Sequence, residues 1–281
     1  IEYGDMQIIA EAYDIMGRGL SMSAPEMQPW FERWNDGRLD SYLIEITADI
    51  LGHTEDDGTP TVDVIVDATG QKGTGKWTVA ASMNQSTPVS LIAESVYARI
   101  VSALLDERQE AASALGDDIE PLTDSVDQVM ADLHDAVYAA KIVSYAQGFM
   151  LLRSASEEYG WDLDLSMIAG LWRAGCIIRS RFLTEITAAY GKNPSLTILL
   201  LDDYFTHQIT QAMPGLRRTV ARAARAGIPV PAYSAALSFF DAFRSRRLPA
   251  NLTQAQRDYF GAHTYERTDA PRGEWFHTNW I

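Results

Sequence analysis

The sequence predicts an all-α fold, a large multi-helix domain, from three observations. Apolar residues recur at helical spacing along most of the chain, residues that begin or end helices separate these stretches, and strands do not alternate with helices. We expect this domain to cover residues 1–281, with an irregular tail at Thr268–Ile281 that is rich in Gly, Pro and Trp. The expected helices cover approximately residues 6–17, 23–34, 39–51, 77–85, 89–115, 124–159, 165–190, 195–205, 208–226, 232–246 and 253–263.

Three local signals refine this outline. Ser23-Ala-Pro-Glu26 combines a capping serine, a proline in the first turn and a glutamate three residues after the cap, which predicts a helix start. Val62–Val66 is the best strand candidate, although it is short and has no evident partner. Cys176 is the only cysteine, and because it lies in the apolar segment AGCIIRS we expect it to be buried in the core.

Composition and charge restrict the class of protein. A net charge of −15 over 281 residues argues against a general nucleic-acid-binding surface, because neutralising phosphates requires a surplus of Lys and Arg. A local basic pocket for a small anion remains compatible with that charge. A single cysteine forms no intrachain disulfide, which fits a reducing compartment. Since no apolar run reaches the roughly 20 residues of a membrane span, we expect a cytoplasmic protein without a membrane or nucleic-acid partner.

Other charged side chains give weaker signals. The five histidines form no pair at metal-ligand spacing and no cluster with the cysteine, so we expect no metal site. Two groups of arginines, the first of them at helical spacing, are predicted to form solvated faces that balance acidic neighbours. They are Arg218, Arg222 and Arg225, and Arg244, Arg246 and Arg247.

The segment GQKGTGKWT, from Gly70 to Thr78, is the most informative local motif. Gly70, Gly75 and Lys76 match the nucleotide-binding pattern G-x-x-x-x-G-K-[ST], but Trp77 replaces the hydroxyl residue that would bind magnesium. No βα pattern surrounds the segment, so the nucleotide-loop interpretation is disfavoured.

Two interpretations of this segment remain. Lys72 and Thr74 offer an ammonium and a hydroxyl to a phosphate oxygen, and the glycines permit close approach of the backbone. An ordinary turn with solvated lysines is the alternative, and spacing alone favours it. Arg99 poses a similar question because it interrupts the apolar face of LIAESVYARIVSALL. It could pair with Glu94 or Glu107, or reach into a pocket.

Several segments together resemble the decarboxylating 6-phosphogluconate dehydrogenase family, specifically its all-helical C-terminal domain. They occur in the family's order and cover essentially the whole chain. The segments are IEYGDMQIIAEAYDIM, LDSYLIEITADIL, GQKGTGKWT, LIAESVYARIVSALLDERQEAA, WRAGCIIRSRFL, ALSFFDAFRS, LPANLTQAQRDYFGAHTYER and FHTNW. The resemblance implies oxidation of 6-phosphogluconate at C3 with NADP, loss of CO2, and protonation of the resulting enediol to give ribulose 5-phosphate.

The resemblance also implies roles for individual residues. In the IEYGDM segment, Glu2 would be the general acid and Tyr3 a contact of the substrate phosphate. Lys72, Thr74 and Arg99 would also contact the phosphate. A dianionic phosphate in so acidic a protein requires convergent cations, which agrees with these roles.

The resemblance further implies a homodimer. Arg257 and His263 of the QRDYFGAH segment would enter the active site of the partner subunit. The family's dinucleotide-binding domain, general-base lysine and His-Asn pair are missing from this sequence, so we expect the chain by itself to lack hydride transfer. A helical dimerisation module without activity of its own is the alternative function.

Overall fold

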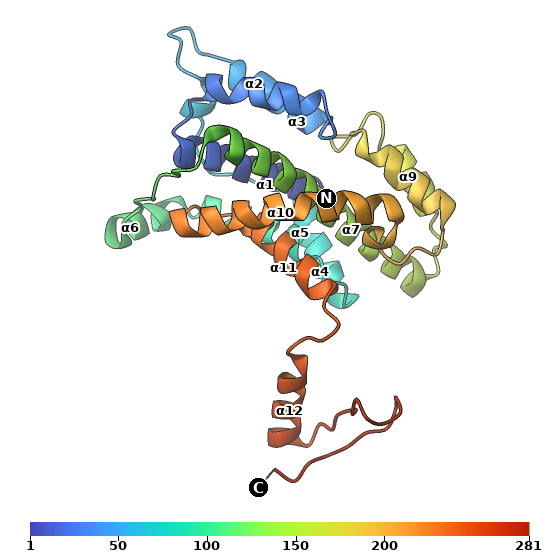
Figure 1. Cartoon of the computed structure of the whole chain (residues 1–281). Coiled ribbons are helices and arrows are strands. Elements are labelled where there is room, and N and C mark those ends of the chain that lie inside the picture. The colour runs from blue at the N-terminus through green and yellow to red at the C-terminus, as the bar shows by residue number, and fades with distance from the viewer. Residues whose placement is uncertain (281) are drawn as a thin grey trace. The chain divides into compact units, whose positions relative to one another are not determined.

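The computed structural model describes residues 1–280, which form helices and loops, and this confirms the all-α prediction (Figure 1). Among these residues, β-pairing is limited to three isolated bridges. The α-helices of the first half are α1 (Glu2–Asp14), α2 (Ala24–Asn35), α3 (Tyr42–Gly52), α4 (Thr74–Asn84), α5 (Ser90–Ala103), α6 (Leu105–Leu115) and α7 (Val126–Tyr159). Those of the second half are α8 (Leu165–Leu171), α9 (Phe182–Lys192), α10 (Asp203–Ala226), α11 (Pro231–Phe243) and α12 (Ala250–Gly261).

The chain divides into two compact units. The first covers Ile1–Phe239, and the second begins at Phe240, inside the last turns of α11. No helix among residues 1–280 is both long enough and apolar enough to cross a membrane.

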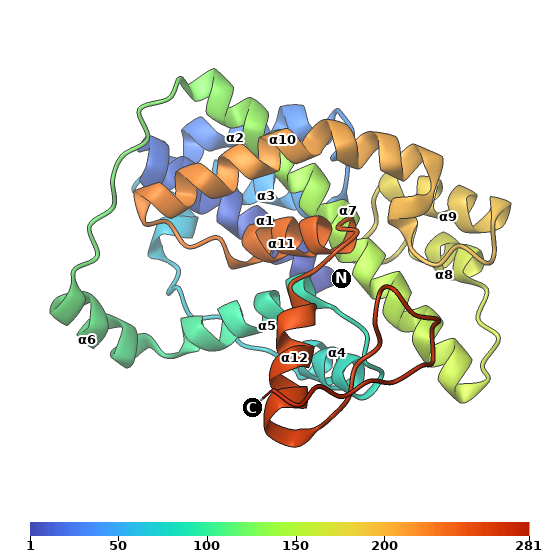
Figure 2. The same cartoon turned by 60° about the horizontal axis from the view of Figure 1, so that its bottom comes forward.

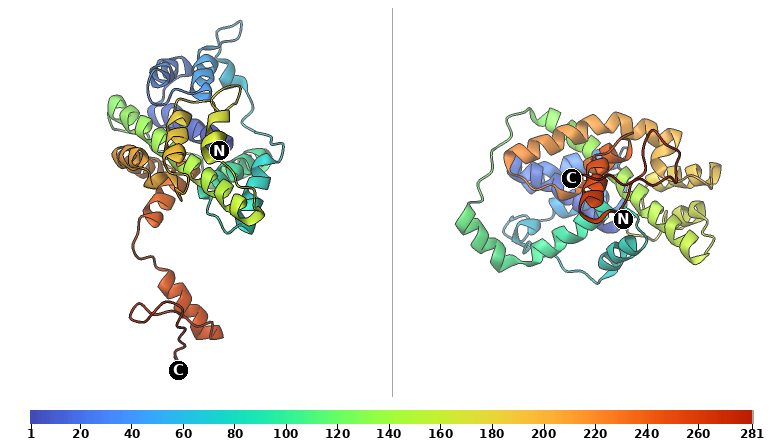
Figure 3. Two further views of the ribbon diagram at one scale, coloured as in Figure 1. Left: turned by 90° about the vertical axis from the view of Figure 1, so that its right-hand side faces the viewer. Right: turned by 90° about the horizontal axis from the view of Figure 1, so that it is seen from below.

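Helix α7 is the centre of the first unit. It has 34 residues, and nearly every side chain from Val129 to Phe149 is buried, as expected for a helix surrounded by others. Helix α10 lies along it, and α1 and α5 pack against it as well (Figures 1 and 2). Helices α2 and α3 form a neighbouring pair (Figure 3). The start of α2 is as predicted, because the Glu26 carboxylate accepts a hydrogen bond from the Ser23 backbone N–H at 2.8 Å.

The strand prediction at Val62–Val66 is wrong. Thr61–Val64 is a 3-10 helix, and Val64, Ile65 and Val66 are exposed. A strand requires a neighbour that completes its backbone hydrogen bonds, and none of the described residues pairs with this segment.

Two predicted long helices are interrupted in the structure. The 89–115 prediction divides into α5 and α6 at Leu104, whose backbone leaves the helical conformation. There the Arg108 guanidinium lies 3.3 Å from the Ser102 carbonyl and 2.9 Å from the Asp67 carboxylate, contacts that local periodicity does not reveal. The 165–190 prediction divides into α8 and α9, separated by turns that include Gly175 with a φ of +66°.

Two further sequence predictions for the first unit need correction. Residues 195–202 form a loop and a 3-10 turn, because α10 begins only after Asp202, whose carboxylate caps the backbone N–H groups of Tyr204 and Phe205. Cys176 lies in the turns before α9 and is only half-buried, so its predicted burial in the core is not confirmed.

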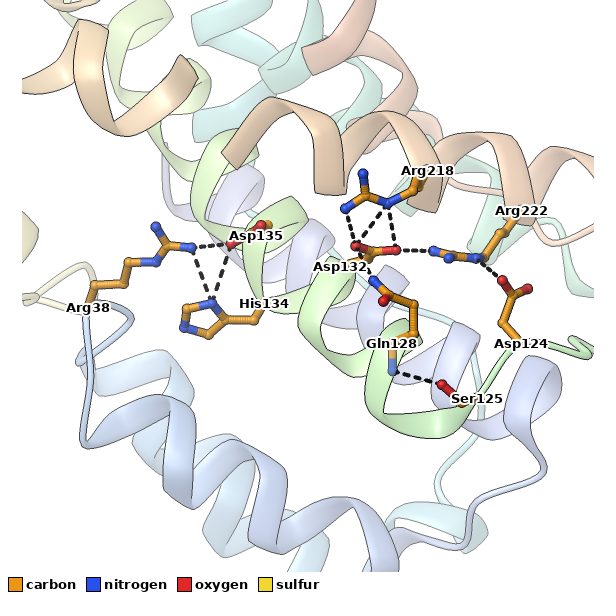
Figure 4. A network of polar contacts seen from close by, with 9 residues as sticks. All are labelled: Arg38, Asp124, Ser125, Gln128, Asp132, His134, Asp135, Arg218 and Arg222. Atoms are coloured by element: carbon orange, nitrogen blue, oxygen red, sulfur yellow. Dashed lines mark hydrogen bonds and ion pairs between the residues drawn. The ribbon is translucent and has the colours of Figure 1, made fainter. Parts of the chain in front are cut away.

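Arg218 and Arg222 of α10 both pair with carboxylates, as expected for an arginine face that balances acidic neighbours (Figure 4). The Arg218 side chain is 50% exposed, as predicted, but that of Arg222 is only 15% exposed, so its predicted solvation is wrong. The Asp132 side chain of α7 is only 2% exposed and accepts hydrogen bonds from the guanidinium groups of Arg218 and Arg222. Arg222 also lies 3.2 Å from Asp124. These ion pairs join the two longest helices of the first unit. Arg225 is exposed, as predicted.

Candidate functional site

The phosphate motif predicted from the sequence lies at the start of α4. Thr74 is the first residue of the helix, and the side chains of Lys72 and Thr74 are exposed. Backbone N–H groups in the first turn of a helix have no partner within the helix, and the helix dipole favours an anion there. No strand precedes this helix in the described chain, so the fold of a nucleotide-binding loop is not formed.

Gly75 connects this helix start to α1 and α5. A Cβ atom at Gly75 would lie 2.6 Å from Tyr3 Cε2 and 2.9 Å from Val96 Cγ2. Distances under 3.0 Å are essentially never found for a real Cβ atom, so only glycine fits here without movement of a neighbour. The start of α4 therefore lies directly against the Tyr3 ring.

Tyr3 and Arg99, which are far apart in the sequence, are in contact. The Arg99 guanidinium carbon lies 3.5 Å from the centroid of the Tyr3 ring, a cation–π stack. The Arg99 Nη2 atom is 3.1 Å from the Met6 sulfur. No carboxylate of the described residues forms an ion pair with Arg99, so pairing with Glu94 or Glu107 is not observed. A half-exposed guanidinium without an acidic partner keeps N–H donors for an anion.

The first turn of α1 holds Glu2 beside Tyr3. Glu2 is the first helical residue and is half-buried. At Gly4 a Cβ atom would lie 2.3 Å from Ser144 Oγ and 3.0 Å from Leu91 Cδ2, so this turn packs closely on α7 and α5. Contacts with two other helices therefore fix the first turn of α1, to which Glu2 belongs.

A buried ion pair that the sequence did not predict also fixes α1. The Asp5 Oδ2 atom accepts hydrogen bonds from Lys141 Nζ at 2.7 Å and from the Tyr145 hydroxyl at 3.2 Å. The side chains of Asp5 and Lys141 are 1% and 6% exposed. Burial, followed by the negative charge of Asp5, raises the pKa of Tyr145 well above its usual value. The sequence signal that could have predicted this ion pair is Lys141, a lysine in the middle of the apolar pattern of residues 124–159.

Arg257 and His263 both lie in the second unit. Arg257 is exposed on α12 and donates a hydrogen bond to Gln254 Oε1 at 3.0 Å. His263 is exposed just after the helix, with its ring centroid 6.0 Å from that of Phe260. In the first unit the Tyr3 ring thus lies against both Arg99 and Gly75, with Glu2 next to Tyr3 on α1 and Lys72 and Thr74 at the start of α4. Arg257 and His263 lie in the second unit.

Asp258 organises the second unit around these two residues. Its side chain is inaccessible to solvent and accepts hydrogen bonds from four N–H groups at 2.9 to 3.1 Å. The donors are the Thr264 and Thr278 backbones, the His277 imidazole and the Trp280 indole. Burial opposes the charge of Asp258, but these bonds outweigh it and hold the pKa well below its usual value.

Comparison with known proteins identifies the family. Residues 1–280 match the family model described as 6-phosphogluconate dehydrogenase, C-terminal domain. Decarboxylating 6-phosphogluconate dehydrogenases from Schizosaccharomyces pombe and Treponema pallidum are each 54% identical over 286 aligned residues. All of this chain is covered in both alignments, but only 58% and 59% of the relatives.

A solved structure agrees with this match. Plasmodium falciparum 6-phosphogluconate dehydrogenase, described in its apo form and in complexes with NADP+ and with 6-phosphogluconate, superimposes with a TM-score of 0.95. The identity is 43%, and the match covers 99% of this chain and 60% of that protein. The chain therefore belongs to the family of 6-phosphogluconate dehydrogenase C-terminal domains.

Proposed function

We propose that this chain supplies the substrate-phosphate site, the general acid and the dimer contact of a 6-phosphogluconate dehydrogenase. The whole enzyme would carry out the NADP-dependent oxidative decarboxylation of 6-phosphogluconate to ribulose 5-phosphate and CO2 in the cytoplasm, as part of the pentose phosphate pathway. The observation that carries this proposal is the convergence of Tyr3, Arg99 and the start of α4 in a chain of this family.

The phosphate group would lie at the start of α4. Lys72 supplies a mobile ammonium group, Thr74 a hydroxyl, and the first turn of the helix its free N–H groups. Arg99 adds a planar guanidinium that suits two phosphate oxygens at once. The Tyr3 hydroxyl has no hydrogen-bond partner among the described residues and would complete the set.

Glu2 would act at the other end of the substrate. Loss of CO2 from the oxidised substrate leaves an enediol. To give the ketone product, one of its hydroxyl groups must lose a proton to a general base while one of its carbons accepts a proton. We assign that proton to the carboxyl group of Glu2, which becomes a carboxylate in the step. Glu2 and Tyr3 are consecutive residues in the first turn of α1, so one turn of helix would serve both the reacting carbon and the phosphate.

NADP is the cofactor of the proposed reaction, since the Plasmodium relative is described with it. Dinucleotides bind at a glycine-rich turn between a strand and a helix of a parallel sheet. Residues 1–280 form no such unit, because their β-pairing consists of isolated bridges. We therefore assign none of these residues to the dinucleotide.

A homodimer would complete each site with Arg257 and His263 of the other subunit. The second unit supports this assignment because its helix α12 exposes an apolar surface. Leu252, Tyr259 and Phe260 are 62%, 58% and 73% exposed. Exposed apolar side chains clustered on one helix mark an interaction surface.

The proposal is tested by titrating the chain with 6-phosphogluconate in a calorimeter. We expect Lys72→Ala and Arg99→Ala each to weaken binding about tenfold or more, the cost of one charge-assisted hydrogen bond. Lys76→Ala is the matched control, because it removes the same charge from the same motif. No binding by the unmodified chain, or equal effects of all three changes, would favour the alternative of a dimerisation module without a substrate site.

A further inference from the structure

Gly75 occupies a position where glycine is unfavourable for the helix itself. It is the second residue of α4, it is buried, and its φ lies outside the left-handed region. Alanine is the better helix former at such a position, so the conformation of the backbone does not explain the glycine. The lack of space for a side chain at this position explains it.

The space at Gly75 is filled by the Tyr3 ring. A Cβ atom would lie 2.6 Å from Tyr3 Cε2, 2.7 Å from Cδ2 and 2.9 Å from Val96 Cγ2. Tyr3 and Val96 are 8% and 3% exposed, so neither side chain can swing into solvent to make room. A methyl group at this position must push α4 away from α1 and α5, or push the ring.

Both movements would change the position of Arg99 relative to the motif. Arg99 lies in van der Waals contact with the Tyr3 ring, at 3.5 Å from its centroid, so a displaced ring displaces the guanidinium. Val96 precedes Arg99 by three residues on the same face of α5. A displaced α4 would instead carry Thr74 and Lys72 away from Arg99.

We propose that Gly75 and the Tyr3 ring are positioning elements for Arg99: the glycine makes room for the ring, and the ring holds the guanidinium at a fixed distance from the start of α4. This role belongs to the ring of Tyr3 and is separate from any contact of its hydroxyl. The inference rests on the proposed phosphate site and adds to it the part that sets its geometry.

The first test compares two glycines of the same motif. Gly75→Ala should weaken 6-phosphogluconate binding about tenfold, because an ångström of misplacement is costly to a preorganised site. Gly70→Ala is the control, since nothing lies within 4 Å of a Cβ atom there and its φ is not left-handed. It should change affinity less than about twofold, as is usual for exposed positions. Thermal melting of each variant shows whether it is folded.

The second test separates positioning from simple packing and is independent of the folding of Gly75→Ala. Tyr3→Phe keeps the aromatic ring and Tyr3→Leu removes it. Both variants lack the hydroxyl group, so the difference between them measures the effect of the ring alone. With Arg99 present, Tyr3→Leu should bind about fivefold or more weakly than Tyr3→Phe. When Arg99→Ala is also present, Tyr3→Phe and Tyr3→Leu should bind 6-phosphogluconate equally well. In a double-mutant cycle, the effect of changing one residue disappears when the residue through which it acts has been removed.

The outcomes separate the two proposals. If the unmodified chain does not bind 6-phosphogluconate, the proposed function fails. If it binds and Arg99→Ala weakens binding, but Gly75→Ala equals Gly70→Ala, the phosphate site stands and the positioning role is overturned. The positioning role is also overturned if the difference between Tyr3→Phe and Tyr3→Leu persists without Arg99.

Discussion

The ion pairs of Asp132 provide the strongest test of what joins α7 to α10. Replacing Asp132 with alanine removes an acceptor that receives hydrogen bonds from Arg218, Arg222 and Gln128 (Figure 4). The helix surface around it stays the same. The change therefore isolates the polar link between the two longest helices.

The magnitude follows from the exposure of the two arginines. Removing one member of a fully buried ion pair costs about 3 to 5 kcal/mol, because an uncompensated charge is left behind. The Arg218 side chain is 50% exposed and regains water, whereas that of Arg222 is 15% exposed and retains Asp124 at 3.2 Å. Only part of the full penalty applies, so we expect Asp132→Ala to lower the free energy of unfolding by about 2 kcal/mol.

Thermal and urea unfolding measure this loss. A change of that size should lower the melting temperature by about 4 to 8 °C in a protein of this length. Glu157→Ala is the control on the same helix, because Glu157 is 66% exposed and pairs with Arg153 at 2.9 Å. An exposed pair is worth at most about 1 kcal/mol. A loss at Asp132 no larger than that at Glu157 would refute the reasoning.

Two further predictions concern pH and subunit exchange. Burial raises the pKa of Glu11 to about 7, although its carboxylate accepts hydrogen bonds from the Ala232 and Tyr233 backbones. The unfolded chain releases this proton first, so between pH 4.5 and 7 the free energy of unfolding should fall by about 3 kcal/mol. Urea midpoints across this range should show that dependence in the unmodified chain and lose it in Glu11→Gln; parallel curves would contradict the assignment. Mixing Arg99→Ala with Arg257→Ala should restore binding in about a quarter of the sites, because half of randomly exchanged dimers are hybrids with one intact site. No recovery after verified exchange would contradict the sharing of sites between subunits.

The sequence predicted those helices whose signals are local. The apolar pattern of 124–159 anticipated α7, and Ser23 anticipated the start of α2. The break at Leu104 and the turns around Gly175 were missed, because they depend on tertiary contacts and turn geometry that helical periodicity does not encode.

The candidate site likewise combines features with a local sequence signal and features that depend on tertiary contacts. Only the resemblance predicts that Lys72 and Thr74 contact the phosphate, since spacing alone favoured an ordinary turn. The stack of Arg99 on Tyr3 joins residues 96 positions apart, so no local pattern contains it. Gly75 carried a readable signal, because a glycine in the first turn of a helix, away from its C-terminal cap, suggests a close neighbour.

The four hydrogen bonds to Asp258 hold the second unit together where a small secreted domain would use a disulfide. They close a loop of about 20 residues from α12 to Thr278, and together they offset the entropy that the chain loses when this loop closes. A short segment with few buried apolar side chains can thereby present Arg257 and His263 in a defined arrangement without a disulfide. Because these hydrogen bonds depend on an ionised Asp258 carboxylate, strong acid should break them, whereas reducing agents should have no effect on them.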